Sequence, residues 1–102
     1  MGWCEARYRC GTLGADLAVV STSDIAVLQA FLDNNAANEE IWVGVKGRKW
    51  LDGRDVENSM WGGTDPNGDP EDCGRMRIFS EGYMLADMTC ERIIKFLCMR
   101  SG

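Results

Sequence analysis

The spacing of apolar positions predicts two helices in the first third of the chain. Trp3, Ala6 and Cys10 recur at intervals of three and four residues, which places them on one face of a helix over residues 3–12. A second stripe follows Ser21, and its apolar members are Ile25, Leu28, Phe31 and Leu32. We expect each helix to bury its apolar stripe against the rest of the domain.

The rest of the chain is dominated by strand patterns. Residues 41–45 form an apolar, β-rich run that predicts a buried central strand. Shorter strands are predicted at 76–80, 83–86 and 93–99. Residues 62–72 hold three glycines, two prolines and four acids, which predicts an irregular loop. Helices followed by strands within residues 1–102 indicate a single α+β domain whose helices pack on antiparallel sheets.

Composition and charge exclude several function classes. The 102 residues carry a net charge of −5 and contain no histidine. The basic residues are scattered, so we expect no nucleic-acid partner. No apolar stretch reaches transmembrane length, so we expect no membrane insertion. Without histidine the common Ser-His and Cys-His catalytic pairs are excluded, and we therefore predict a binding domain and not an enzyme. The acidic balance is compatible with a bound cation.

Five cysteines indicate an oxidising, extracellular location. No CxxC pair is present, which argues against a zinc ribbon or a thioredoxin-like motif. No signal peptide is visible, and we interpret the chain as a mature or excised segment of a secreted protein with a start methionine added. Four cysteines permit three pairings, so spacing alone leaves the connectivity open.

A series of short motifs extends over nearly the whole chain. The motifs are, in order, Trp3-x-x-Ala6-x-x-x-Cys10, Trp42-Val43-Gly44-Val45, Trp50-Leu51-Asp52-Gly53 with Trp61, Asp65-Pro66-Asn67, Glu71-Asp72-Cys73, Leu85-Ala86-Asp87-x-x-Cys90 and Phe96-Leu97-Cys98. Each motif is weak alone, but the seven together resemble, in order and spacing, the C-type lectin-like domain family. The resemblance implies that family's fold, with two helices, small sheets and a long irregular loop.

The resemblance also implies the disulfide pairing. It predicts the bridges Cys10–Cys98 and Cys73–Cys90, which leaves Cys4 without an intramolecular partner. Family members usually begin with a strand that pairs with the closing strand, and this chain is similar to a short form without it. We therefore expect residues 93–98 to present an unpaired edge, and the domain to form a homodimer through Cys4, through this edge, or through both.

In this family a calcium ion and a sugar share one site. The resemblance places Asp65, Asn67, Glu71 and Asp87 as the oxygen ligands, and it implies a cis peptide bond before Pro66. Calcium prefers hard oxygen ligands from carboxylates and amides, which this set supplies. Triplets with asparagine in third place, as at Asn67, resemble mannose- or glucose-type sites.

Three departures weaken that site. Asp65 is one methylene shorter than the usual Glu or Gln, Ala86 replaces an Asn ligand, and Leu85 replaces a Trp. The family's auxiliary calcium site is also expected to be missing, because Gly68 stands where an acid is usual. The first hypothesis is calcium-dependent binding of cell-surface or microbial glycans, as in innate immunity. The alternative is a calcium-independent module that binds protein ligands on the same fold, with a solvated acidic loop.

Overall fold

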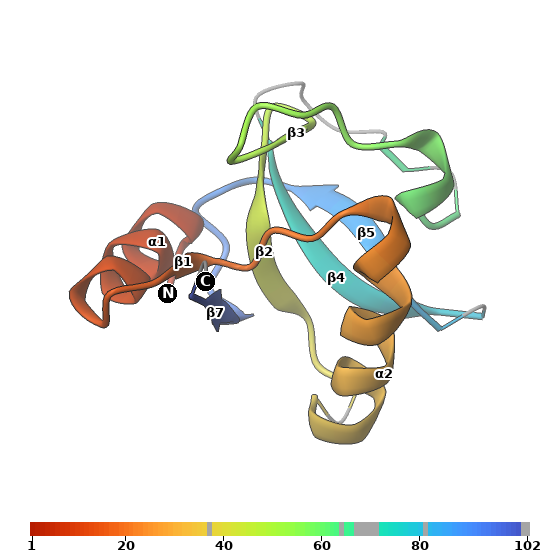
Figure 1. Ribbon diagram of the computed structural model, residues 1–102, viewed down its shortest axis with the longest axis horizontal. Coiled ribbons are helices and arrows are strands. Elements are labelled where there is room, and N and C mark those ends of the chain that lie inside the picture. The colour runs from red at the N-terminus through yellow and green to blue at the C-terminus, as the bar shows by residue number, and fades with distance from the viewer. Residues whose placement is uncertain (37, 64, 67–71, 81, 101–102) are drawn as a thin grey trace.

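A small mixed sheet built around one buried strand forms the centre of the molecule. The computed structural model describes residues 1–36, 38–63, 65–66, 72–80 and 82–100. The elements in these ranges are α1 (Trp3–Thr12), β1 (Asp16–Leu17), the 3-10 turn η1 (Thr22–Asp24), α2 (Ile25–Asn35), β2 (Ile41–Lys46), β3 (Lys49–Trp50), the 3-10 turn η2 (Asn58–Met60), β4 (Cys73–Phe79), β5 (Gly82–Met88), β6 (Lys95–Phe96) and β7 (Cys98–Met99). The predicted α+β class is confirmed, and Figure 1 shows α1 and α2 lying on either side of β2.

The predicted central strand is β2. It pairs antiparallel with β3 and β4 and parallel with β6, and residues 41–45 are all buried. Gly44 lets the segment after β1 cross this strand closely, since its amide donates to the Ala18 carbonyl at 2.7 Å. A Cβ at Gly44 would stand 2.9 Å from the Leu17 carbonyl oxygen, so a larger residue would push the two segments apart.

Strands β4 and β5 form the longest ladder of the sheet. Their antiparallel register runs from Cys73 opposite Met88 to Phe79 opposite Gly82. The sequence pattern predicts only residues 76–80 and 83–86, because polar residues interrupt the apolar run at both ends. The continuous backbone pairing extends the strands to their observed lengths.

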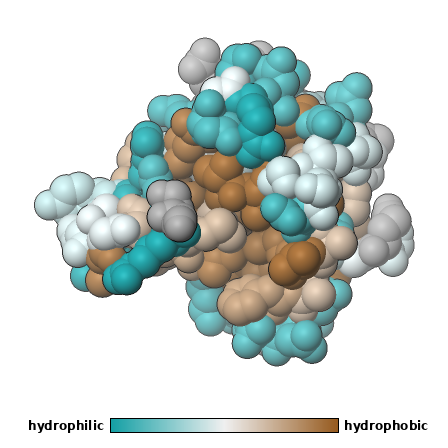
Figure 2. All heavy atoms as spheres, viewed as in Figure 1, coloured by the Kyte–Doolittle hydropathy of each residue, from teal (hydrophilic) through white to brown (hydrophobic). Residues whose placement is uncertain are grey.

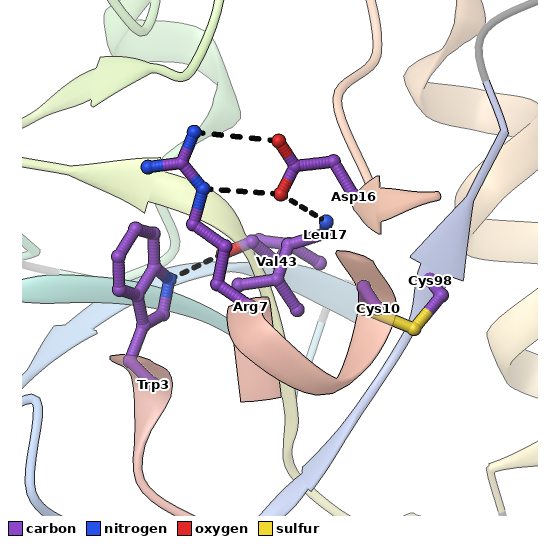
Figure 3. Close-up of polar contacts among 7 residues, drawn as sticks. All are labelled: Trp3, Arg7, Cys10, Asp16, Leu17, Val43 and Cys98. Carbon is purple, nitrogen blue, oxygen red and sulfur yellow. Dashed lines mark hydrogen bonds and ion pairs between the residues drawn. A yellow bond between two sulfur atoms is a disulfide. The ribbon is translucent and has the colours of Figure 1, made fainter. Parts of the chain in front are cut away.

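Helix α1 is anchored to the centre of the sheet. Trp3 is buried, and its indole Nε1 donates to the Val43 carbonyl at 2.8 Å (Figure 3). On the same helix Arg7 forms an ion pair with Asp16 (3.2 Å), and the side chain of Cys10 is covalently linked to β7. The predicted helix and its buried face are both confirmed.

Helix α2 buries a narrower stripe than its sequence predicts. Leu28 and Leu32 are buried, and the side-chain Nε2 of Gln29 donates to the Tyr83 backbone carbonyl of β5. Phe31 was predicted to join the buried stripe, but its side chain is 48% exposed. It lies on the flank of the helix, where none of the described elements covers it fully.

The closing segment is split between two sheets. Lys95 and Phe96 pair with β2, whereas Cys98 and Met99 pair with β1. Between them the Leu97 amide donates to the Trp42 carbonyl, and the Leu97 carbonyl accepts from the Ala18 amide. The short strand after α1 and the central strand therefore pair with the inner side of this segment, and the unpaired edge expected at residues 93–98 stays a prediction.

Both predicted disulfides are confirmed. Cys10–Cys98 joins residues 88 apart in sequence, and Cys73–Cys90 joins residues 17 apart. Closing loops of these lengths stabilises the fold by roughly 3 to 5 kcal/mol each in chain-entropy models. Cys4 is a free, exposed thiol on α1. Among the helices that the structure describes, none is both long and apolar enough to cross a membrane.

Candidate functional site

Two predicted site residues, Asp65 and Asp87, lie side by side at one edge of the sheet. Asp87 sits near the end of β5, and only 9% of its surface is exposed. Asp65 is half-buried in the loop that follows Trp61, and its carboxyl group hydrogen-bonds to that of Asp87. The tertiary structure thus brings together one residue from a loop and one from a strand.

The loop that carries Asp65 is held against β5 by its backbone. Trp61 forms a parallel bridge with Leu85, and the Gly62 amide donates to the Leu85 carbonyl at 2.9 Å. The Asp65 amide then donates to the Gly62 carbonyl at 3.0 Å, which closes a tight turn. The bond between Asp65 and Pro66 is cis, as the family resemblance implied.

Close packing of Phe79 against two glycines supports this loop. A Cβ on Gly62 would lie 2.4 Å from the Phe79 ring, and one on Gly63 would lie 3.2 Å from it. The guanidinium of Arg77 covers the same ring at 4.4 Å from its centroid. Sequence analysis missed Phe79, because its role depends on contact with a distant Gly-Gly pair.

The electrostatics of the carboxylate pair favour a shared proton or a cation. Burial raises the pKa of Asp65, and the hydrogen bond and negative charge of Asp87 raise it further. The positive charges of Arg75 and Arg77 partly oppose this rise in the pKa of Asp65. Two carboxylates held together in this way repel each other when both are ionised. A shared proton relieves this repulsion, and so does a bound divalent cation.

Arg75 fixes the strand that carries Asp87. Its Nη1 donates to the Asp87 backbone carbonyl at 2.6 Å, and its Nε pairs with the Glu40 carboxylate at 2.6 Å. Most of the Arg75 side chain is buried. This arginine links the segment before β2 to the end of β5 and so positions the Asp87 backbone.

The family of the chain follows from a comparison with family models. The model of the lectin C-type domain matches residues 1–100. The chain belongs to this family. C-type lectin domains bind carbohydrate and do not catalyse reactions, which agrees with the prediction of a binding domain.

Similar proteins place the domain among diverse C-type lectins. It is 27% identical to human lymphocyte antigen 75 over 98% of the chain, and it spans only 6% of that protein. A crystal structure of the C-type lectin domain of murine dendritic cell inhibitory receptor 2, in complex with N-glycan, is similar with a TM-score of 0.79 and 22% identity, covering 95% of this chain and 80% of the other. The Ca²⁺-independent C-type lectin SPL-2 from Saxidomus purpuratus is similar with a TM-score of 0.75 and 22% identity, covering 89% and 72%.

The described residues of this C-type lectin domain supply two of the four predicted calcium ligands. Asn67 and Glu71 lie outside the described residues, and within the described ranges no three acidic or cysteine side chains form a metal-binding group. The two carboxylates present are hard oxygen donors that fit calcium. Ala86 is fully buried beside Asp87 and offers no side-chain oxygen.

The aromatic side chains of the lectin domain belong to its core. Trp42 and Trp50 are buried, as predicted, and Trp61 is buried beside the loop that leads to Asp65. None of these three rings forms an open platform for stacking on a sugar.

Proposed function

We propose that this C-type lectin domain binds carbohydrate in a calcium-dependent manner. The proposed ligand set is Asp65, Asn67, Glu71 and Asp87. The observation that carries the proposal is the close approach of the carboxyl groups of Asp65, in a loop, and Asp87, in β5. The pair occupies the positions at which the family resemblance predicts a cation-binding pair.

The chemistry of the Asp65–Asp87 pair explains how one site would bind both calcium and a sugar. When bound, calcium supplies a Lewis-acidic centre that accepts hydroxyl oxygens of a sugar. Asp65 and Asp87 each have carboxylate oxygens that accept hydrogen bonds from sugar hydroxyls. The backbone bonds from Gly62 to Leu85 and from Arg75 to Asp87 hold both carboxylates in place, which lowers the entropic cost of binding.

The ligand class and the location are also proposals. Asn67 favours a mannose- or glucose-type glycan on a cell or microbial surface. Two disulfides in 102 residues support an extracellular, secreted setting. Several similar proteins are described as lectins, and one has been captured with GlcNAc.

A second candidate function is calcium-independent binding of a protein or glycan. Ala86 supplies no side-chain oxygen ligand, and the short side chain of Asp65 reaches less far toward a cation. The similar SPL-2 is described as Ca²⁺-independent. In this case the carboxylate pair would hold a proton instead of a cation. The two candidates therefore differ in the response of the folded protein to calcium.

A calcium titration with a thermal-melt readout tests the first proposal. A cation that binds only the folded state raises the melting temperature as its concentration exceeds the dissociation constant. We expect a rise for the wild type and for Asp33→Asn, an exposed acid on α2, but none for Asp87→Asn. A wild-type melting temperature that calcium leaves unchanged would exclude the calcium site. A glycan array with calcium or with chelator then separates the two candidates.

A further inference from the structure

Among the described residues, three arginines line one polar pocket next to the end of β5, although the chain has a net charge of −5. Arg75 and Arg77 come from β4, and Arg92 comes from the segment between β5 and β6. The volume of this arginine pocket is about 380 Å³. It shares no described lining residue with the apolar groove beside α2, the helix over which Figure 2 shows apolar side chains. The pocket is therefore a separate, positively charged surface.

The charges of the arginine pocket are only partly balanced. Glu40 is the acid among the described lining residues, and its carboxylate pairs with the Nε of Arg75 at 2.6 Å. Within the described part of the chain, Arg77 and Arg92 form no ion pair. Two guanidinium charges of the pocket therefore remain to attract an anion.

The two arginines present their guanidinium groups differently. The Arg77 guanidinium lies over the Phe79 ring at 4.4 Å from its centroid, and this contact restrains the plane of the group. A guanidinium stacked in this way keeps its N–H donors at the rim of its plane, where an oxyanion can accept them. Arg92 is exposed, and its neighbour Glu91 accepts a hydrogen bond from the Thr89 hydroxyl at 2.7 Å. Arg77 therefore offers a positioned fork of donors, and Arg92 adds a second cation that can adjust to the anion.

The arginine pocket adjoins the carboxylate pair of the proposed calcium site. Arg75 donates to the Asp87 backbone carbonyl at 2.6 Å, and Met88, the residue after Asp87, belongs to the pocket lining. Arg77 is also close enough for its charge to oppose the rise in the pKa of Asp65. A sugar held at Asp65 and Asp87 would therefore lie beside the pocket.

We propose that Arg77 and Arg92 bind a sulfate or phosphate ester carried by the sugar, so that the domain favours glycans with such an ester. This inference rests on the proposed carbohydrate function, because the ester is a substituent of the sugar held at the neighbouring site. A tetrahedral ester has three terminal oxygens and can accept from two guanidinium groups at once. A carboxylate has two oxygens, which one bidentate guanidinium occupies. Two separate arginines therefore favour the tetrahedral group.

Competition binding in calcium with four related sugars tests the proposal. The probes are mannose, its 6-sulfate, its 6-phosphate and mannuronate, which has a carboxylate at the same carbon. We expect one or both esters to bind roughly tenfold more tightly than mannose, the gain that exposed charge-assisted hydrogen bonds provide. The tighter ester identifies the group that the pocket prefers. The gain should shrink at high salt, because the two arginines are solvent-accessible.

Variants of the two arginines assign the gain to the pocket. In Arg77→Gln and in Arg92→Gln the ratio of ester affinity to mannose affinity should fall to near unity. Arg9→Gln is the matched control, because it removes the same charge from an exposed position on α1, and it should keep the wild-type ratio. Melting curves show whether each variant is folded. The exposed Arg92 is the decisive position, since Arg77 also packs on Phe79.

Inorganic sulfate in chelator tests the pocket without calcium or sugar. We expect the Nε–H NMR signals of Arg77 and Arg92 to shift saturably in sodium sulfate, but not in sodium chloride of equal ionic strength. The signal of Arg9 should stay in place. If these shifts occur while no probe binds in calcium, the proposed carbohydrate function fails and the anion pocket stands, so the two failures are distinguishable.

Three results would overturn the proposal. The first is a pair of esters that bind no more tightly than mannose, with no sulfate-induced shift at Arg77 and Arg92. The second is mannuronate that binds as tightly as the better ester, which would contradict the preference for a tetrahedral group. The third is an affinity ratio that Arg92→Gln lowers no more than Arg9→Gln does, which would place the anion elsewhere.

Discussion

The carboxyl groups of Asp65 and Asp87 share a hydrogen bond, although one lies in a loop and the other at the end of a strand. The contact raises the pKa of Asp65 and makes the cation-free site electrostatically unfavourable when both groups are ionised. Stability and calcium binding should therefore both respond to removal of one carboxylate charge and to a change of pH.

Replacing one carboxylate should stabilise the calcium-free protein and abolish its calcium binding. We expect Asp65→Asn to raise the melting temperature by a few degrees at neutral pH in chelator, because it removes like-charge repulsion. The same substitution should abolish the calcium-induced rise. Differential scanning calorimetry with chelator and with calcium measures both effects, and a retained calcium response would place the cation elsewhere.

The raised pKa of Asp65 determines the sign of a pH effect. From its unperturbed pKa of 3.8 up to its folded-state value, the folded chain keeps a proton that the unfolded chain has lost. The contribution of Asp65 to the stability of the calcium-free protein therefore falls as pH rises through this window. Calcium must displace the same proton, so its affinity should fall as pH decreases into the window. Calcium titrations at several pH values check this, and Asp65→Asn should remove the Asp65 contribution to the stability change in chelator.

Gly62→Ala should disturb the loop that carries Asp65. The new methyl group would lie 2.4 Å from the Phe79 ring, so the ring or the loop must move. We expect a loss of about 1 to 3 kcal/mol in the free energy of unfolding, typical of overpacking, together with weaker calcium binding. Gly11→Ala is the matched control, because a Cβ there meets no atom within 4 Å. Equal stability of the two variants would show that the Phe79 contact is unimportant.

Trp3→Phe tests the anchor of α1. The substitution keeps an aromatic ring but removes the indole Nε1, which donates to the buried Val43 carbonyl oxygen at 2.8 Å. Leaving a buried acceptor without a partner costs about 1 to 3 kcal/mol. Denaturant unfolding measures the loss, and Tyr8→Phe on the exposed side of the same helix should cost almost nothing. A Trp3→Phe protein as stable as wild type would contradict the assigned anchor.

Local patterns in the sequence determined much of this fold. The three- and four-residue spacing of Trp3, Ala6 and Cys10 predicts α1 and its buried face, because helix periodicity is a local property. The apolar run at 41–45 predicts β2 for a similar reason. The ordered motifs of the family resemblance supplied the two disulfide pairings and the positions of Asp65 and Asp87.

Only the tertiary structure decided which of these residues meet. Phe79 packs on Gly62, and Arg75 joins Glu40 to the Asp87 backbone, because loop paths and strand register bring distant segments together. The exposure of Phe31 has the same origin. Its helical spacing is that of a buried residue, but burial requires a neighbouring surface, and among the described residues Phe31 only lines an open apolar groove. Periodicity specifies which face of an element is apolar, whereas long-range packing determines what covers that face.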